Sequence, residues 1–242
     1  KIAILGSSLI LFKQPVKELA KLNIIVGYDG SHVLGLIAGQ TFQDPLKEGA
    51  SALFGSTHKS FFGPQGGIFL SNEDLEIDKM ILHKLVDNAH WNRIAALTWA
   101  LLEMKHFGKE YAHQIIKNSQ ALAKNLYERK FPITGEEYGF TESHQVLMIF
   151  QDYKKNMDFA KRLEEANIIV DCGIRLGVNE VTRRGMKEKE MERIAELIER
   201  VYKGEDIEKV RQDVIKLRKE FDDIEYRFKD VNLNYLIEEL IK

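Results

Sequence analysis

Two side chains of this sequence have the types and surroundings that covalent chemistry on an aldehyde requires. Lys59 ends the run Ser56-Thr57-His58-Lys59, and Asp29 begins the run Asp29-Gly30-Ser31-His32. A lysine attacks an aldehyde only as the free amine, so it needs a sheltered site where burial and neighbouring cations disfavour the ammonium form. A carboxylate that keeps a pyridine nitrogen protonated lets the ring withdraw electrons from a neighbouring bond. This pair of residues predicts a site for pyridoxal phosphate.

The elements expected around these residues are those of a parallel α/β fold. A helix with a proline at its start is predicted from Pro15 to Leu22, between the first two strands. Apolar runs predict four strands, at Ile2–Leu5, Ile24–Tyr28, Ala52–Gly55 and Gly67–Leu70. Because such sheets bind ligands beyond the carboxyl ends of their strands, the carboxylate of Asp29 is expected at a ligand site.

The pattern changes to long helices from about Asp87. Apolar residues at steps of three and four predict one helix up to Met104 and a second from Tyr111 to Leu126, with Phe107-Gly108-Lys109 between them. A smaller α/β unit is expected to follow. Its predicted elements are a strand at Gln145–Phe150, a helix at Asp158–Ala166, strands at Ile168–Val170 and Ile174–Leu176, and a helix at Met186–Tyr202.

Beyond Gly204 the sequence is densely charged, and Val210, Val214, Leu217 and Phe221 form a narrow apolar stripe. We interpret this stripe as one face of a solvated helix that rests on the body; a partner-binding helix is the alternative. The predicted division is residues 1–106 for part of a large cofactor-binding domain with its connecting helix, 107–204 for a small α/β domain, and 205–242 for a charged helical extension.

Composition limits the partners. With 242 residues, 44% of them hydrophobic, the chain can bury a sizeable core, and 35 basic against 37 acidic residues leave a charge of −2. Because the charges nearly balance, the chain has no overall electrostatic attraction for nucleic acid or for an anionic membrane surface, and neither partner is predicted. The single cysteine, Cys172, excludes an internal disulfide and a cysteine-rich zinc site; no metal is predicted, and the compartment is expected to be the cytosol.

Four separated blocks resemble serine hydroxymethyltransferases. The resemblance runs from Lys1 to about Tyr202 and is weakest in the helical middle. The short length of this chain and its high content of Lys, Glu and Ile resemble archaeal members of the family. The blocks are Asp29 to Ala38, Ser56-Thr57-His58-Lys59 with Gly63-Pro64-Gln65-Gly66-Gly67, Gly173-Ile174-Arg175-Leu176-Gly177, and Val181-Thr182-Arg183-Arg184-Gly185. The fold implied is part of the fold type I (aspartate aminotransferase-like) large domain of pyridoxal phosphate enzymes, followed by a small C-terminal α/β domain.

The resemblance also implies a role for each site residue. Lys59 would form the Schiff base with the cofactor aldehyde, and Asp29 would pair with the pyridine nitrogen. His32 would contact the ring hydroxyl, while Ser8, Ser56 and His58 would be further cofactor contacts.

Arg175 would hold the carboxylate of the amino acid substrate. A guanidinium fork suits a carboxylate because it donates two parallel hydrogen bonds. A structural salt bridge is the alternative role for this arginine. Arg183 and Arg184 are expected to be surface or structural groups.

The sequence departs from the family at Phe62 and Gln65, and Asp87 to Arg93 replaces a glycine-rich loop that reaches the partner subunit's phosphate. His90 and Arg93 would substitute as anion ligands, or else be an ordinary helix-start histidine and a solvated arginine. The opening strand at Lys1 indicates a C-terminal portion of a longer polypeptide. The family's ring-stacking aromatic residue, catalytic glutamate and most pterin contacts belong to the N-terminal half, so weak cofactor retention and little turnover are expected of this chain alone.

The activity implied is interconversion of serine and glycine, with transfer of the hydroxymethyl group to tetrahydrofolate or tetrahydromethanopterin, in one-carbon metabolism and amino-acid biosynthesis. A homodimer is expected. A pterin-independent lyase such as a threonine aldolase is the nearest alternative, and a non-catalytic protein that kept the fold is another.

Overall fold

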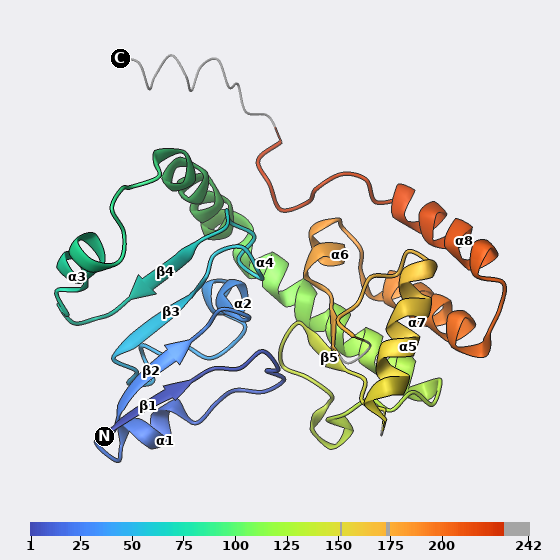
Figure 1. Cartoon of the computed structure of the whole chain (residues 1–242), viewed down its shortest axis with the longest axis horizontal. Helices are drawn as coiled ribbons and strands as arrows, with labels where there is room; N and C mark the ends of the chain where they lie inside the picture. The colour runs from blue at the N-terminus through green and yellow to red at the C-terminus, as the bar shows by residue number, and fades with distance from the viewer. Residues whose placement is uncertain (151, 173–174, 230–242) are drawn as a thin grey trace.

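The computed structural model describes residues 1–150, 152–172 and 175–229, which form two α/β units along one long helix (Figure 1). The first unit contains a four-stranded sheet in the order β1-β2-β3-β4. Its strands are β1 (Ile2–Leu5), β2 (Ile25–Asp29), β3 (Ala52–Ser56) and β4 (Gly67–Leu70). The first three are parallel, and β4 runs antiparallel to β3. All four predicted strands are confirmed, with bounds that differ by at most one residue.

Three short helices accompany this sheet: α1 (Val16–Ala20), α2 (Leu34–Ala38) and α3 (Ile77–Lys84). Side chains alternate between the two faces of each strand. Val26, Tyr28 and Leu53 point into the buried core on one face. On the other face Ile2, Ile4 and Ile25 are 70%, 66% and 54% exposed. Parallel sheets are usually covered on both faces, so the described residues leave one apolar face of this sheet open.

The long helix α4 (Trp91–Glu128) runs without interruption through Gly108. The prediction of two helices with a break near Gly108 was wrong. A Cβ on Gly39, at the end of α2, would lie 2.3 Å from the Ala112 Cβ and 2.5 Å from the Gly108 carbonyl oxygen. Small residues at these positions let α2 approach α4 closely. Gly108 therefore allows close packing of the two helices and does not end α4.

The second unit is built on the two-stranded antiparallel sheet of β5 (Gln145–Leu147) and β6 (Arg175–Gly177). Around it lie a 3₁₀ turn at Glu136–Tyr138 and the helices α5 (Tyr153–Glu165), α6 (Asn179–Arg183) and α7 (Glu188–Lys203). The predicted helices at Asp158–Ala166 and Met186–Tyr202 are thus confirmed with shifted bounds.

The strand predicted at Ile168–Val170 was wrong. Ile168 and Val170 pack against the core without joining a sheet, and Ile169 between them is 84% exposed. Gly173 and Ile174 lie outside the described residues.

Beyond α7, helix α8 (Ile207–Lys219) buries Val210 and Leu217 against the body, as the apolar stripe predicted. Residues 220–229, called the strap below, then return toward α4 (Figure 1). There the Phe228 ring lies 5.7 Å from the Trp99 ring and 5.3 Å from the Phe107 ring. Residues 230–242 of the predicted extension lie outside the described part. Within that part, no helix has the length and apolar character needed to cross a bilayer. The predicted domain division at residue 106 falls inside α4, which both units share.

Candidate active site

The carboxylate of Asp29 lies at the carboxyl end of β2, as expected. Its Oδ1 accepts a hydrogen bond from the Ser31 backbone N–H at 2.9 Å, which fixes the turn into α2. The loop after β1 contacts this aspartate closely, since a Cβ on Gly6 would lie 2.6 Å from the Asp29 Cβ. Gly6 has φ +129°, a backbone conformation that other residues rarely adopt. Glycine at this position therefore brings the loop that carries Ser8 against Asp29.

The ends of β2 and β3 are joined through serine hydroxyls. The Ser31 Oγ accepts from the Ser56 backbone N–H at 3.0 Å and from the Ser56 Oγ at 3.3 Å. Ser56 thus lies one hydrogen bond away from the Asp29 turn. His58 faces the glycine turn instead, where its Nδ1 accepts from the Gly66 N–H at 3.4 Å.

The Lys59 Nζ lies 3.4 Å from the Nε2 of His32. The side chain of Lys59 is exposed, so the sheltered site expected for this lysine is not found in the described residues. The physical reason is that the described residues around Lys59, from the first unit and from the second, cover only part of its side chain and leave the rest in contact with solvent.

His32 is half-buried and lies parallel to the ring of His144, with 6.2 Å between ring centroids and 6° between planes. The pKa of His32 is lowered to about 4, mainly by burial and next by the cations of Lys59 and Arg175, whose effect exceeds the opposite effect of the Asp29 and Asp171 carboxylates. Burial likewise lowers the pKa of His144 to about 3, and its Nδ1 has no hydrogen-bond partner among the described residues. Both rings are therefore neutral at pH 7.

Arg175, at the start of β6, reaches the same place from the second unit. Its Nη1 donates to the Ser8 carbonyl oxygen at 2.8 Å, and its Nη2 forms a 2.8 Å salt bridge with Asp171. The structural alternative for Arg175 is thus present in this conformation. A substrate carboxylate would share or replace the Asp171 contact, and the substrate-binding role stays a prediction.

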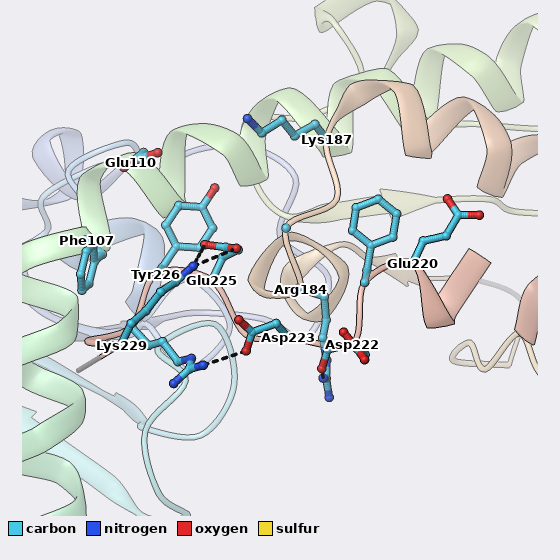
Figure 2. A pocket seen from close by; sticks show the side chains of 13 residues that line it. Phe107, Glu110, Arg184, Lys187, Glu220, Asp222, Asp223, Glu225, Tyr226 and Lys229 are labelled. Atoms are coloured by element: carbon cyan, nitrogen blue, oxygen red, sulfur yellow. Dashed lines mark hydrogen bonds and ion pairs between the residues drawn. The ribbon is translucent and has the colours of Figure 1, made fainter. Parts of the chain in front are cut away.

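A cavity of about 400 Å³ adjoins these residues, with His32, Lys59, His144, Gln145 and Arg175 in its lining. A larger cavity of about 690 Å³ lies elsewhere, between α4 and the strap (Figure 2). Its lining contains both acidic and basic residues, among them Glu110, Glu225, Arg184 and Lys229. Glu225 and Lys229 form an ion pair with each other (Figure 2). The smaller cavity contains the lysine and the histidines, and we take it as the candidate active site.

The structure separates the other candidate residues from this cluster. Arg93, in the first turn of α4, lies near the glycine turn, since a Cβ on Gly66 would be 2.7 Å from its Nη1. His90 precedes α4 and is exposed. The role of Arg93 and His90 as anion ligands stays a prediction. Arg183 is structural, as expected: it forms a 2.7 Å ion pair with the buried Glu103.

Four residues that complete the site were not among the candidates predicted from the sequence: Ser31, His144, Gln145 and Asp171. His144 and Gln145 lie more than a hundred residues from His32 in the chain and meet it only because β5 packs beside the loop after β1. In the sequence, His144 and Gln145 are two polar residues at the start of an apolar strand, and this pattern does not identify which residue they contact.

Comparisons with known proteins agree with this geometry. The family model described as serine hydroxymethyltransferase matches residues 7–198. Serine hydroxymethyltransferases from Archaeoglobus fulgidus and Methanocaldococcus jannaschii are 44% and 46% identical to the chain over 94% of its length. The chain spans only 57% and 59% of these relatives.

A crystal structure of the L-threonine transaldolase from Pseudomonas fluorescens in its internal aldimine state is similar to the chain, with a TM-score of 0.88 and 35% identity. The match covers 99% of the chain and 59% of that protein. This similarity confirms the predicted α/β fold of pyridoxal phosphate enzymes.

Proposed function

Because the chain belongs to the serine hydroxymethyltransferase family, we propose that it carries the lysine-bearing part of an active site that interconverts serine and glycine. The observation that carries this proposal is the meeting of Lys59, His32 and Arg175 beside the Asp29 turn, at the carboxyl ends of parallel strands. The chain covers less than two thirds of its relatives, so the activity, substrates and partners described below are proposals for the whole enzyme.

The residues present fit pyridoxal phosphate. An amine, a carboxylate at a strand end, a neutral imidazole and two serines lie within one connected set of contacts, and Gly6 lets the loop after β1 reach them. When bound, this cofactor supplies the electron sink that weakens a bond at the substrate α-carbon. Lys59 would hold the cofactor aldehyde covalently, and Asp29 would keep the ring nitrogen protonated. His32, Ser8, Ser56 and His58 would contact the cofactor.

Arg175 would orient the amino acid by its carboxylate, through two charge-assisted hydrogen bonds from the guanidinium group. The Nη1 bond to the Ser8 carbonyl holds the arginine near the cofactor loop. The hydroxymethyl group would pass to a reduced pterin, either tetrahydrofolate or tetrahydromethanopterin. The loop at residues 167–171, which adjoins both Arg175 and the cavity, supports a pterin contact from this side.

We also propose that the enzyme is a homodimer that works in the cytoplasm, in amino-acid biosynthesis. Leu82, Leu85 and Trp91, on and beside α3 and α4, are 61%, 75% and 76% exposed. Apolar surface of this kind supports a contact with a second copy. Light scattering that finds a dimer would agree with this proposal, and a monomer at all concentrations would contradict it.

The decisive experiment uses the full-length protein that contains this chain. It compares Lys59→Ala with Lys47→Ala, a control at a lysine that is 85% exposed in a surface ion pair. We expect the absorbance of the lysine-bound cofactor and the cleavage of serine to disappear in Lys59→Ala and to persist in the control. An unchanged absorbance in Lys59→Ala would show that another residue holds the cofactor.

The similarity to the threonine transaldolase favours a second candidate, a pterin-independent lyase of the threonine aldolase kind. Assays of serine and threonine with and without each pterin separate the two. Serine cleavage that requires a pterin supports the hydroxymethyltransferase. Threonine cleavage that is indifferent to the pterin supports the lyase.

The chain by itself is expected to retain the cofactor weakly and to turn over little, because Lys59 is exposed and one face of the sheet is open. Gel filtration after incubation with pyridoxal phosphate measures the cofactor that stays bound. Stoichiometric retention by the chain alone would contradict this expectation.

A further inference from the structure

Gln145, the first residue of β5, is fully buried beside the candidate active site, and its side chain makes three hydrogen bonds. Its Oε1 accepts from the Ile10 backbone N–H at 2.8 Å. Its Nε2 donates to the Ser8 carbonyl oxygen at 3.0 Å and faces the Nδ1 of His32 at 3.3 Å. Nothing in the residue roles implied by the family resemblance assigns a function to this glutamine.

The orientation of the Gln145 amide is fixed by its two backbone partners. A backbone N–H can only donate and a backbone carbonyl can only accept, so the amide oxygen must face Ile10 and the NH₂ group must face Ser8. The reversed orientation would set two donors against each other at Ile10 and two acceptors at Ser8. Since the side chain has no exposed surface, water would not compensate for either mismatch. The group that Gln145 turns toward His32 is therefore an N–H donor.

We propose that Gln145 is a positioning residue that holds neutral His32 in the tautomer with its proton on Nε2. The reason is that Nδ1 must supply the lone pair that accepts the remaining N–H of Gln145, so the single ring proton is left on the other nitrogen. A doubly protonated ring would place an N–H against the N–H of Gln145. The depressed pKa of His32 is consistent with this arrangement.

The consequence is a fixed donor aimed at the lysine side of the site. The Nε2 atom lies 3.4 Å from the Lys59 Nζ. Its N–H can bond to that nitrogen only when the amine has a free lone pair, which is the form in which lysine is a nucleophile. If the function proposed above is correct, the same N–H is a donor for the ring hydroxyl oxygen of the cofactor. The tautomer itself depends on this chain's residues alone.

The test measures the tautomer in the whole chain without cofactor or substrate, so its failure is separate from failure of the proposed function. Long-range proton–nitrogen correlations on protein labelled with ¹⁵N-histidine show which ring nitrogen carries the proton at neutral pH, and His32→Gln identifies the His32 signals. We expect the proton on Nε2. A proton on Nδ1 in the unmodified chain would overturn the proposal, whatever the variants show.

Two substitutions then test the cause. In Gln145→Glu the carboxylate can only accept, so we expect a proton to appear on His32 Nδ1. In Gln145→Met the donor is lost at similar volume, and we expect a mixture of both tautomers. If both variants are folded and keep the proton on Nε2 alone, Gln145 does not set the tautomer.

Gln43→Glu is the matched control. Gln43 is also buried, accepts from the Gln14 N–H at 2.8 Å and donates to the Gln14 carbonyl at 3.0 Å, but does not contact His32. This variant measures the cost of replacing such a glutamine, and the His32 signals should be unchanged. A shift of the His32 tautomer in Gln43→Glu equal to that in Gln145→Glu would indicate a general effect of destabilisation and would overturn the proposal.

Discussion

The imidazoles of His32 and His144 lie parallel beside Lys59, and burial keeps both of them neutral. Two adjacent cationic rings would repel each other and the nearby Lys59 and Arg175. In the neutral pair, His32 instead presents its Nε2–H to the lysine as a hydrogen-bond donor. Such a donor adds no positive charge beside an amine that must be uncharged to act as a nucleophile.

The low pKa of His144 predicts that the chain loses stability when it is acidified. Between pH 6.5 and about 3 the unfolded His144 binds a proton that the folded ring does not, so the free energy of unfolding falls as the pH falls through this window. At pH 5 the loss from this residue is expected to be about 2 kcal/mol relative to pH 7. Urea unfolding at the two pH values measures it.

His144→Phe should keep the stacked ring and remove this part of the pH dependence. The control is His113→Gln on the exposed face of α4, which should leave the dependence unchanged. If His144→Phe and the unmodified chain lose the same stability between pH 7 and 5, His144 is not the group that titrates.

Arg175 can be tested in the full-length enzyme. Arg175→Lys removes the fork that contacts Ser8 and Asp171, and a lysine cannot donate two parallel bonds to a carboxylate. Loss of one charged hydrogen bond corresponds to a ten- to hundredfold rise in the KM for serine, on the order of 1.5–3 kcal/mol. The cofactor absorbance should remain. Arg184→Lys, at a surface position outside the cavity, should change neither quantity.

Among the elements, the contact between α2 and α4 positions the loop that carries His32, because α2 begins two residues after it. Gly39 at the end of α2 has an ordinary backbone conformation, so only packing requires the glycine. In Gly39→Ala the added methyl group would overlap Ala112 and the Gly108 carbonyl. We expect a loss of stability of about 1–3 kcal/mol, measured by urea unfolding.

Gly139→Ala is the comparison for this variant. Gly139 has φ +76° and nothing within 4 Å of an added Cβ, so its cost would come from backbone strain alone. That cost is expected to be about 1–2 kcal/mol. A Gly39→Ala protein as stable as the unmodified chain would show that α2 can move away from α4 without penalty.

The elements also show what the sequence could predict. The sequence could place Asp29 and Lys59 near one edge of the sheet, because parallel strands bring their carboxyl ends together. Lys59 was chosen for its flanking motif, and the roles of both residues stay predictions. Gly108 was misinterpreted because glycine disfavours a helix locally, whereas its reason here is a contact with α2 far away in sequence. The contact between His32 and Gln145 was missed because no local pattern encodes a pairing across 113 residues.

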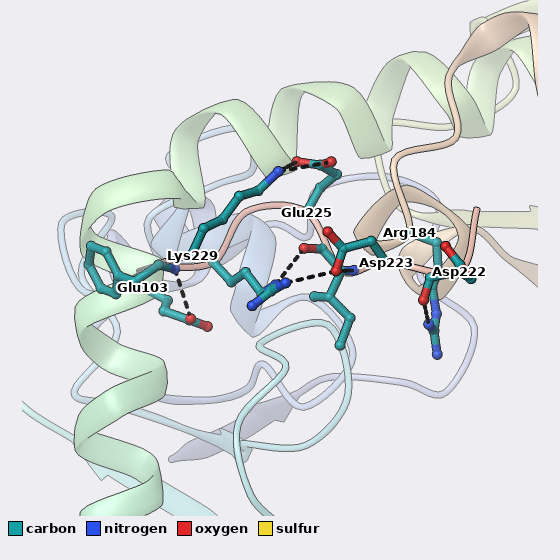
Figure 3. A network of polar contacts seen from close by, with 9 residues as sticks. Glu103, Arg184, Asp222, Asp223, Glu225 and Lys229 are labelled. Carbon is teal, nitrogen blue, oxygen red and sulfur yellow. Dashed lines mark hydrogen bonds and ion pairs between the residues drawn. The ribbon is translucent and has the colours of Figure 1, made fainter. Parts of the chain in front are cut away.

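In the molecule as a whole, Arg183 joins four segments. From the end of α6 it pairs with Glu103 of α4, donates to the Tyr226 carbonyl of the strap, and lies over the Phe62 ring at 3.8 Å. Phe62 comes three residues after Lys59, so the strap and the site share this arginine. Figure 3 shows the rest of the connection, in which Glu103 accepts from the Phe228 N–H and Arg184 donates to the Asp222 carbonyl.

Arg183→Met should therefore destabilise the whole chain and release the strap. Glu103 is 6% exposed and would be left as a buried charge without its partner, which costs about 3–5 kcal/mol. The expected results are a lower midpoint in urea unfolding and faster proteolysis within residues 220–229. Adding Glu103→Gln removes the unpaired charge and should restore part of the stability. Arg184→Met loses one surface hydrogen bond to the Asp222 carbonyl and leaves no buried charge, so its midpoint in urea unfolding should resemble that of the unmodified protein. Proteolysis of the strap in Arg183→Met at the same rate as in the unmodified protein would show that Arg183 does not hold the strap to α4.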